Sequence, residues 1–96
     1  MNDVVNPEVI GRNAVAAVLS ERVKTHGDYG DHATLTQNLK DMFETYAPSF
    51  SRMSAIEKEA VAMILHKLGR VGAGDPHFKD HWVDIAGYAQ LVADRL

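Results

Sequence analysis

The sequence predicts an all-α fold: one domain, residues 1–96, folded as a four-helix bundle that oligomerisation completes. Four segments repeat apolar residues every three or four positions, which is the helical period, and no segment shows the alternation of a strand. The length suits a single domain, and 46% of the residues are apolar. Because so short a chain buries only a modest core, helix packing between copies would add stability.

The first helix is expected over residues 7–24. Asn6 can cap it, Pro7 suits the first helical position because the N–H it lacks would be unpaired there, and Glu8 favours the first turn. The apolar side of this helix consists of Ile10, Ala14, Val18 and either Ala17 or Val15. Two glycines and an aspartate within residues 25–30 then predict a turn.

Two further helices are expected over residues 32–46 and 55–71. Asp31 can cap the first of them, and Pro48 ends it. Ser54 and Glu57 have the spacing of a capping box, in which each side chain accepts a hydrogen bond from the other residue's backbone N–H. The apolar sides of the two helices consist of Leu35, Leu39, Met42, Phe43 and Tyr46, and of Ile56, Ala60, Ile64, Leu68 and Val71.

The fourth helix is expected over residues 76–95, with Asp75 as its cap and Pro76 at its first position. The glycine-rich connection at 72–74 is short, so this helix should lie antiparallel beside the helix at 55–71. If the helix is regular, carboxylates and imidazoles share one stripe next to the apolar stripe, and these residues are His77, Asp80, His81 and Asp84.

Composition excludes several classes of function. The formal net charge of -3 gives no basic field for nonspecific binding to nucleic acid. The absence of cysteine excludes disulfides and thiolate zinc sites, and it fits the cytoplasm. No apolar run reaches the roughly 20 residues of a membrane span, and the N-terminus lacks the layout of a signal peptide. We therefore expect a cytoplasmic protein without a membrane partner.

Two successive helices carry residues of the kind that hold a divalent cation. Glu59 and His66 follow one flank of the helix at 55–71, and an antiparallel neighbour can bring Asp80, His81 and Asp84 opposite them. Oxygen ligands favour magnesium or manganese, and the histidines leave zinc or nickel open. The alternative is a solvated acidic flank, because the macrodipole favours acids in the first turns of a helix anyway.

A second group of residues suits a phosphate. Lysine and histidine around the turn at 24–29 can hold phosphate oxygens, and a tyrosine can stack on a base. Near the end of the third helix, an arginine can bind a phosphate bidentately. The alternative is that cations near a helix C-terminus are stabilised by the helix dipole without any ligand. The candidate substrate-binding residues are Lys24, His26, Asp28, Tyr29, Lys67 and Arg70.

Three stretches together resemble a known family. Residues 24–30 read KTHGDYG, residues 59–70 read EAVAMILHKLGR and residues 80–88 read DHWVDIAGY. They resemble a group of small phage and prophage proteins, many known only as domains of unknown function, which in turn resemble the MazG-like all-α nucleoside triphosphate pyrophosphohydrolases. The resemblance covers about residues 20–93, and its most specific part is the last stretch.

The resemblance implies a helical bundle that forms a homodimer or homotetramer and uses magnesium to convert a nucleoside or deoxynucleoside triphosphate to monophosphate and pyrophosphate. The family's metal ligands are acids on successive helices, in the patterns Glu-x-x-Glu and Glu-x-x-Asp. Asp84 matches the final aspartate, and His81 stands at the paired glutamate. Glu59 matches one acid of the first pair, but Ala62 occupies the second position.

The expected function is therefore a metal-dependent pyrophosphohydrolase. Glu59 and Asp84 would be catalytic, and the metal ligands, for Mg²⁺ or alternatively Mn²⁺, would be Glu59, His66, Asp80, His81 and Asp84. Two of the family's acids are replaced, so either Asp80 and His66 reorganise the site or the protein binds a nucleotide without cleaving it. In the second case it would be a phage protein that sequesters a nucleotide signal in the host cytoplasm, or that inhibits a host defence factor.

Overall fold

A computed structural model describes residues 7–96, and their side chains from residue 14 onward. This part of the chain contains the α-helices α1 (Pro7–His26), α2 (Tyr29–Tyr46), α3 (Ala55–Ala73) and α4 (Lys79–Ala93), and a short 3₁₀-helix η1 (Phe50–Arg52). Within these residues there is no strand, so the all-α prediction is confirmed. None of the described helices is long and apolar enough to cross a membrane.

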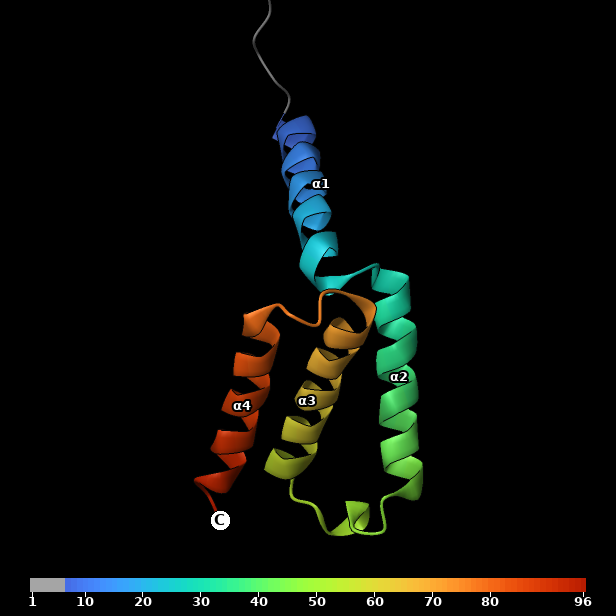
Figure 1. Ribbon diagram of the computed structural model, residues 1–96, viewed down its shortest axis with the longest axis vertical. Helices are drawn as coiled ribbons and strands as arrows, with labels where there is room; N and C mark the ends of the chain where they lie inside the picture. The colour runs from blue at the N-terminus through green and yellow to red at the C-terminus, as the bar shows by residue number, and fades with distance from the viewer. Residues whose placement is uncertain (1–6) are drawn as a thin grey trace, which may run out of the picture.

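Three of the helices form a layer, and the fourth projects from it. Figure 1 shows α2, α3 and α4 side by side with α3 in the middle, while α1 extends beyond one end of the layer. The overall dimensions of 65 × 26 × 25 Å reflect this projection. Because α1 does not lie along the other helices, one chain does not enclose a four-helix bundle by itself. A bundle completed by oligomerisation stays a prediction.

The turn between α1 and α2 is shorter than the sequence suggested. α1 continues to His26 and α2 begins at Tyr29, instead of residues 24 and 32. The cap of α2 is Asp28, whose carboxylate accepts the N–H of Asp31 at 3.1 Å, so the prediction that Asp31 caps this helix is wrong. The predicted cap of α1, Asn6, lies outside the described residues.

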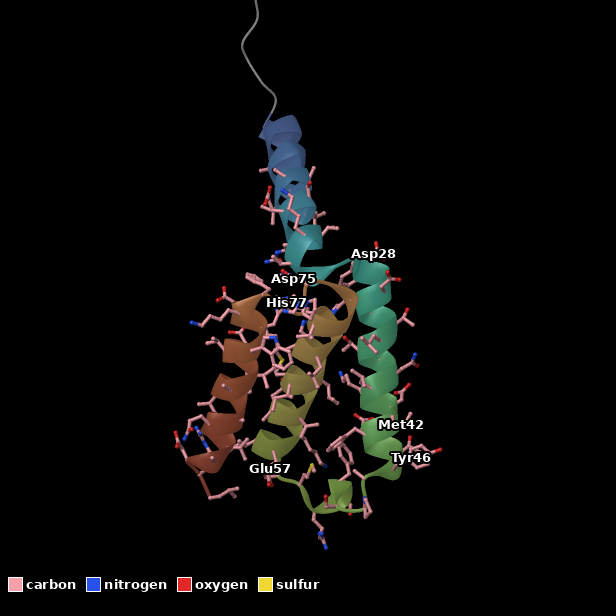
Figure 2. The ribbon with its side chains drawn as sticks, viewed as in Figure 1. Asp28, Met42, Tyr46, Glu57, Asp75 and His77 are labelled. Carbon is pink, nitrogen blue, oxygen red and sulfur yellow. The ribbon has the colours of Figure 1, made fainter. Side chains whose placement is uncertain are left out.

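The start of α4 also differs from the expectation. The helix begins at Lys79, not at residue 76, because the Asp75 carboxylate accepts the N–H of His77 at 2.8 Å and holds a turn there. Trp82 supports this turn by donating its indole N–H to the Pro76 carbonyl at 2.8 Å. His77 therefore lies outside the helix (Figure 2), and α4 ends at residue 93 rather than 95. α3 continues to residue 73, two residues past the expected end.

The start of α3 confirms the capping box, and its contribution is testable. The Ser54 hydroxyl accepts the Glu57 N–H at 3.1 Å, and the Glu57 carboxylate accepts the Ser54 N–H at 2.8 Å. These bonds lower the pKa of Glu57. We expect Ser54→Ala to lower the free energy of unfolding by about 1 kcal/mol, measured by urea denaturation. The exposed Ser51→Ala is the control, and equal values for the two variants would contradict the prediction.

The hydrophobic core of the single chain is small. Among the described residues Ala60 is the one buried apolar side chain, and the other buried side chains are polar: His32, Thr36 and His81. α2 and α3 approach closely where Gly69 faces Thr36 and His32, because any Cβ at Gly69 would overlap the Thr36 hydroxyl. Large apolar side chains stay exposed on every α-helix, including Val18, Leu19, Met42, Tyr46, Ile56, Val83 and Leu91.

Candidate functional site

The end of α1 is tied to the ends of α3 and α4 around one carbonyl group. The Thr25 carbonyl accepts the Asp75 N–H at 3.0 Å and lies 2.9 Å from Nε2 of His81. Because a carbonyl only accepts, this nitrogen of His81 carries a hydrogen. His81 is 2% exposed and is therefore the most deeply buried of the large side chains. His81 was predicted to be a metal ligand, and this bond occupies its Nε2.

The turn after α1 packs directly against the end of α3. Gly27 has φ +79°, a conformation that suits glycine, and a Cβ there would overlap the carbonyl of Ala73. Gly74 is close to the same turn, since a Cβ on it would overlap the Thr25 carbonyl. Gly27 and Gly74 thus allow the end of α1 to contact the end of α3. This contact brings residues of α1, α2 and α3 around one cavity.

That cavity is the candidate site. It measures about 740 Å³, open mouth included, and lies where α1 ends, α2 begins and α3 ends. Four of the six predicted substrate-binding residues line it: His26, Asp28, Tyr29 and Arg70. The remaining lining residues are Leu19, Arg22, Val23, Gly27, His32 and His66. The residues predicted from the turn and from the end of α3 therefore do meet, and Figure 2 shows Asp28 beside this junction.

Two arginines give the cavity its charge. Arg22 comes from α1 and Arg70 from α3. Among the described residues, the salt bridges are Lys24–Glu21 and Lys67–Asp84, and neither arginine takes part in one. Burial lowers the pKa of Arg70 and the nearby charge of Arg22 lowers it further, while the charge of Asp84 raises it without outweighing them. The two guanidinium groups therefore repel each other, and an anion between them would relieve that repulsion.

The histidines of the cavity are neutral at pH 7. Burial, and then the charge of Arg70, lowers the pKa of His26 and of His66 to about 4. The pKa of His32 is lowered mainly by burial, and its Nδ1 is buried without a hydrogen-bond partner. The rings pack edge to face, with centroids 4.7 Å apart for His32 and His66 and 4.9 Å apart for His26 and His81. They supply polar but uncharged atoms to the walls.

These lowered pKa values predict loss of stability in acid. An unfolded histidine binds its proton near pH 6.5, while His26 and His66 do so only near pH 4 when folded. Between these values the unfolded chain binds more protons, so the free energy of unfolding should fall as the pH drops from 6.5 to 4. Urea denaturation of wild type and of His26→Gln/His66→Gln at several pH values checks this. Equal slopes for the two proteins between pH 6.5 and 5 would contradict it.

The predicted metal ligands are separated by the register of α3 and α4. Nζ of Lys67 lies 2.9 Å from the carboxylate of Asp84, which pairs the end of α3 with the start of α4 and lowers the pKa of Asp84. Glu59, eight residues earlier on α3, lines a cavity together with Val92, eight residues later on α4. Eight helical residues span about 12 Å, so Glu59 cannot share one ion with Asp84 inside a single chain.

The other predicted ligands do not join them. Asp80 is exposed in the first turn of α4, and His66 packs on His32. Among the described side chains, those of residues 14–96, no three histidines, aspartates or glutamates are placed to hold a metal ion. Magnesium needs several oxygen ligands in octahedral geometry, so the described residues of one chain do not fit it. Magnesium or manganese as cofactor stays a prediction, and we derive no reaction step through either ion.

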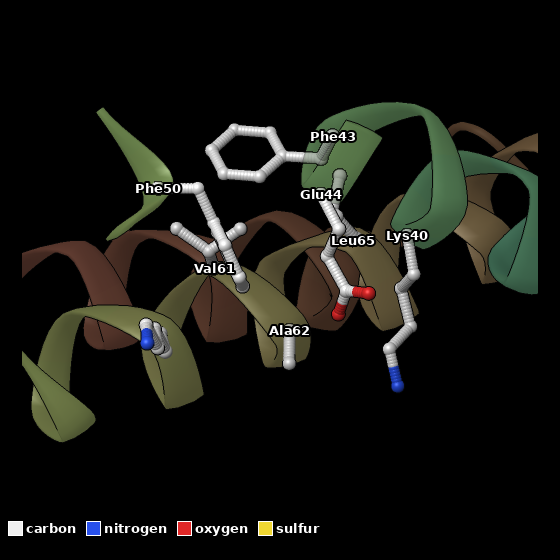
Figure 3. A pocket seen from close by; sticks show the side chains of 8 residues that line it. Lys40, Phe43, Glu44, Phe50, Val61, Ala62 and Leu65 are labelled. Atoms are coloured by element: carbon white, nitrogen blue, oxygen red, sulfur yellow. The ribbon is translucent and has the colours of Figure 1, made fainter. Parts of the chain in front are cut away.

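Two predicted substrate-binding lysines lie elsewhere. Lys24 is exposed on α1 and pairs with Glu21 at 3.1 Å. Lys67 pairs with Asp84 instead of lining the cavity. A second cavity between α2 and α3 (Figure 3) contains Phe43 and Phe50 and is mainly apolar, with the ammonium of Lys58 4.9 Å from the Phe50 ring centre. Its charged lining residues are Lys40, Lys58 and Glu44, so it has no counterpart of the arginine pair.

The sequence reasoning missed Arg22 and His32. Arg22 precedes His26 by four residues, and this spacing places both on one face of a helix. The spacing indicates a shared face only if α1 continues to residue 26, whereas the sequence predicted its end at residue 24. His32 follows Asp28 by four residues in the same way, but its burial depends on Gly69 of α3, which local spacing does not reveal.

A family model described as a domain of unknown function, DUF6378, matches residues 9–95. This span includes the cavity and all four α-helices apart from the first two residues of α1. No curated protein and no solved structure matches the chain.

Proposed function

The chain belongs to the DUF6378 family, and from that premise we propose that it is a nucleotide-binding protein whose cavity holds the phosphate groups between Arg22 and Arg70. The observation that carries the proposal is the pair of arginines from different helices that share one cavity and have no carboxylate partner among the described residues. Arginine is suited to this role because its planar guanidinium binds phosphate oxygens bidentately.

The electrostatics of the empty cavity favour an anionic ligand. Arg70 is partly buried, and Arg22 lowers its pKa further, so the free protein already holds two like charges close together. A phosphate offsets both charges at once. Asp28 is the one carboxylate among the lining residues, but it is exposed and accepts the N–H of Asp31 at the start of α2.

The remaining walls suit a base and a sugar. The Tyr29 ring is 78% exposed and offers a flat surface for stacking, as aromatic side chains do with single bases. Leu19 and Val23 make one side apolar, and the neutral rings of His32 and His66 offer hydrogen-bonding nitrogens. A mononucleotide, which joins an anionic phosphate to a flat base, matches this combination of charge and flat surface.

Hydrolysis of a nucleoside triphosphate to monophosphate and pyrophosphate is a second proposal, and its acids lie outside the lining of this cavity. It rests on the resemblance to MazG-like enzymes and on Asp84, whose pKa is lowered by Lys67 so that it stays ionised. Glu59 and Asp84 are too far apart along the helices to cooperate in one chain, so this reading requires a homo-oligomer that supplies further acids. Binding alone needs no such step, and it would serve to sequester a nucleotide signal.

Isothermal titration calorimetry tests the binding proposal. Nucleoside mono-, di- and triphosphates, deoxynucleotides and cyclic nucleotides are titrated against the purified protein, and the corresponding nucleosides serve as the control without phosphate. We expect at least one nucleotide to bind and its nucleoside to bind much more weakly. Failure of every nucleotide to bind would overturn the proposal. Pyrophosphate release measured with magnesium and with manganese separates hydrolysis from binding alone.

A further inference from the structure

The charges that line the candidate cavity are few, and they limit what its ligand can be. Arg22 and Arg70 keep their positive charge at pH 7, and neither takes part in a salt bridge among the described residues. The rings of His26, His32 and His66 add no charge there, because burial lowers the pKa of each of them. The cavity therefore presents two positive charges and neutral polar walls.

The other charged residues predicted to bind substrate are already balanced. Asp28 is exposed, and its carboxylate accepts a backbone N–H at the start of α2, where the positive end of the helix dipole offsets its charge. Nζ of Lys24 lies 3.1 Å from the carboxylate of Glu21, and Nζ of Lys67 lies 2.9 Å from that of Asp84. Among the described lining residues, the charge without a counter-charge is that of the two arginines.

The two arginines act on one place, which His26 marks. Burial and then the charge of Arg70 lower the pKa of His26 to about 4, and the charge of Arg22 contributes to the same shift. Arg22 precedes His26 by four residues, so the two lie on one face of α1, whereas Arg70 comes from α3. A phosphate beside His26 is therefore between guanidinium groups that approach it from two different helices.

Two guanidinium groups match a terminal phosphate in charge and in geometry. A phosphate monoester carries about two negative charges at pH 7 and has three free oxygens. Each guanidinium can then bind one pair of those oxygens. A phosphodiester, as in a cyclic nucleotide, carries about one negative charge, and both arginines would compete for its two free oxygens.

A triphosphate brings charge that the lining does not offset. Its additional phosphate groups need further cations, and proteins supply them as magnesium held by one or two carboxylates. Among the described lining residues the one carboxylate is that of Asp28, which is bound to the start of α2. The side chains of residues 14–96 include no three histidines, aspartates or glutamates placed to hold a metal ion. This lining does not fit the magnesium that the resemblance implies.

Taking the proposed function as its basis, we propose that the ligand is a nucleoside monophosphate whose terminal phosphate lies between Arg22 and Arg70 and is bound without a divalent cation. The charge of the phosphate then equals that of the arginines, and the neutral histidine rings and Tyr29 are left for the sugar and the base.

Isothermal titration calorimetry on the full chain tests this choice of ligand. The 5′-monophosphate, the 3′,5′-cyclic monophosphate and the triphosphate of each common nucleoside are titrated first with EDTA and then with magnesium. We expect one monophosphate to bind at least about ten-fold more tightly than its cyclic and triphosphate counterparts, because it alone matches both charges with three free oxygens. Magnesium should leave the affinity for the monophosphate unchanged.

Arg22→Gln tests whether both arginines select the terminal phosphate. It should weaken binding of the monophosphate about thirty-fold and largely remove the preference over the cyclic nucleotide. Lys24→Gln is the matched control, because it removes the same charge from α1 at a residue that Glu21 already pairs. It should change neither the affinity nor the preference. Far-ultraviolet circular dichroism checks that the α-helices persist in both variants.

The possible results distinguish the choice of ligand from the proposed function. A triphosphate or a cyclic nucleotide that binds as tightly as the monophosphate, with or without magnesium, overturns the choice and keeps nucleotide binding. An unchanged preference in Arg22→Gln also overturns it, because the second arginine then plays no part in the selection. Failure of every nucleotide to bind removes the proposed function, and the choice of ligand with it.

Discussion

Replacing Arg70 with glutamine is expected to weaken nucleotide binding about thirty-fold, or about 2 kcal/mol, because a charge-assisted hydrogen bond to phosphate is lost. The free protein should not become less stable. Burial and the charge of Arg22 both lower the pKa of Arg70, so removing its charge relieves repulsion in the empty cavity. Calorimetry with the tightest-binding nucleotide and urea denaturation of the free protein measure the two effects.

Arg52→Gln is the matched control for this substitution. Arg52 is exposed at the end of η1, which lies at the opposite end of the layer from the cavity (Figure 1). It removes the same charge from the chain and should leave the affinity unchanged. Equal affinities for Arg70→Gln and the wild type would contradict the role of Arg70. Equal losses in both variants would show that the net charge of the protein, not the cavity, governs binding.

Replacing Gly27 with alanine is expected to lower the free energy of unfolding by about 3 kcal/mol. The left-handed backbone at φ +79° costs an alanine about 1–2 kcal/mol, and overlap with the Ala73 carbonyl adds about 1–3 kcal/mol. For a domain of this size the melting temperature should fall by about 15 °C. Thermal denaturation at one fixed protein concentration measures the change.

Gly87→Ala is the control for the Gly27 substitution. Gly87 lies inside α4, and a Cβ there meets nothing within 4 Å. Alanine should therefore stabilise the helix by up to about 1 kcal/mol. The two substitutions add the same methyl group, so their opposite signs isolate the contact between the turn and α3. A Gly27→Ala variant as stable as the wild type would contradict that contact.

Local sequence patterns predicted the helices well and their ends less well. The capping box of Ser54 and Glu57 is confirmed. It could be predicted because all its atoms lie within four residues. The start of α2 was misjudged because two aspartates compete for it, and the start of α4 was misjudged because Asp75 forms a turn and leaves Phe78 at the cap position. Asp28 caps α2 in place of Asp31, and Asp75 holds a turn in place of capping α4. Sequence alone does not decide between neighbouring carboxylates when both can accept a backbone N–H.

The candidate site was predicted in part, and the difference has a physical cause. His26, Asp28, Tyr29 and Arg70 were expected to bind one ligand, and they line one cavity. The grouping of Glu59 with Asp84 depended on the register of two antiparallel α-helices, which apolar periodicity does not fix. Helical spacing alone allows the carboxylates of Glu59 and Asp84 to lie opposite each other. The actual register of α3 and α4 separates them by about two helical turns.

The projection of α1 was also beyond local patterns. Its apolar repeat predicted a helix with one buried side, and the helix is present. Which surface covers that side depends on tertiary and quaternary contacts. Thr25, Gly27 and Gly74 fix where α1 ends, and they direct it away from the layer.

The most direct test of the central claim is a crystal structure of the protein grown with the nucleotide that binds most tightly in calorimetry. We predict phosphate oxygens within hydrogen-bonding distance of the guanidinium groups of both Arg22 and Arg70, with the base near Tyr29. A nucleotide bound elsewhere, for example beside Glu59 between α3 and α4, with no ligand between the two arginines, would contradict the account.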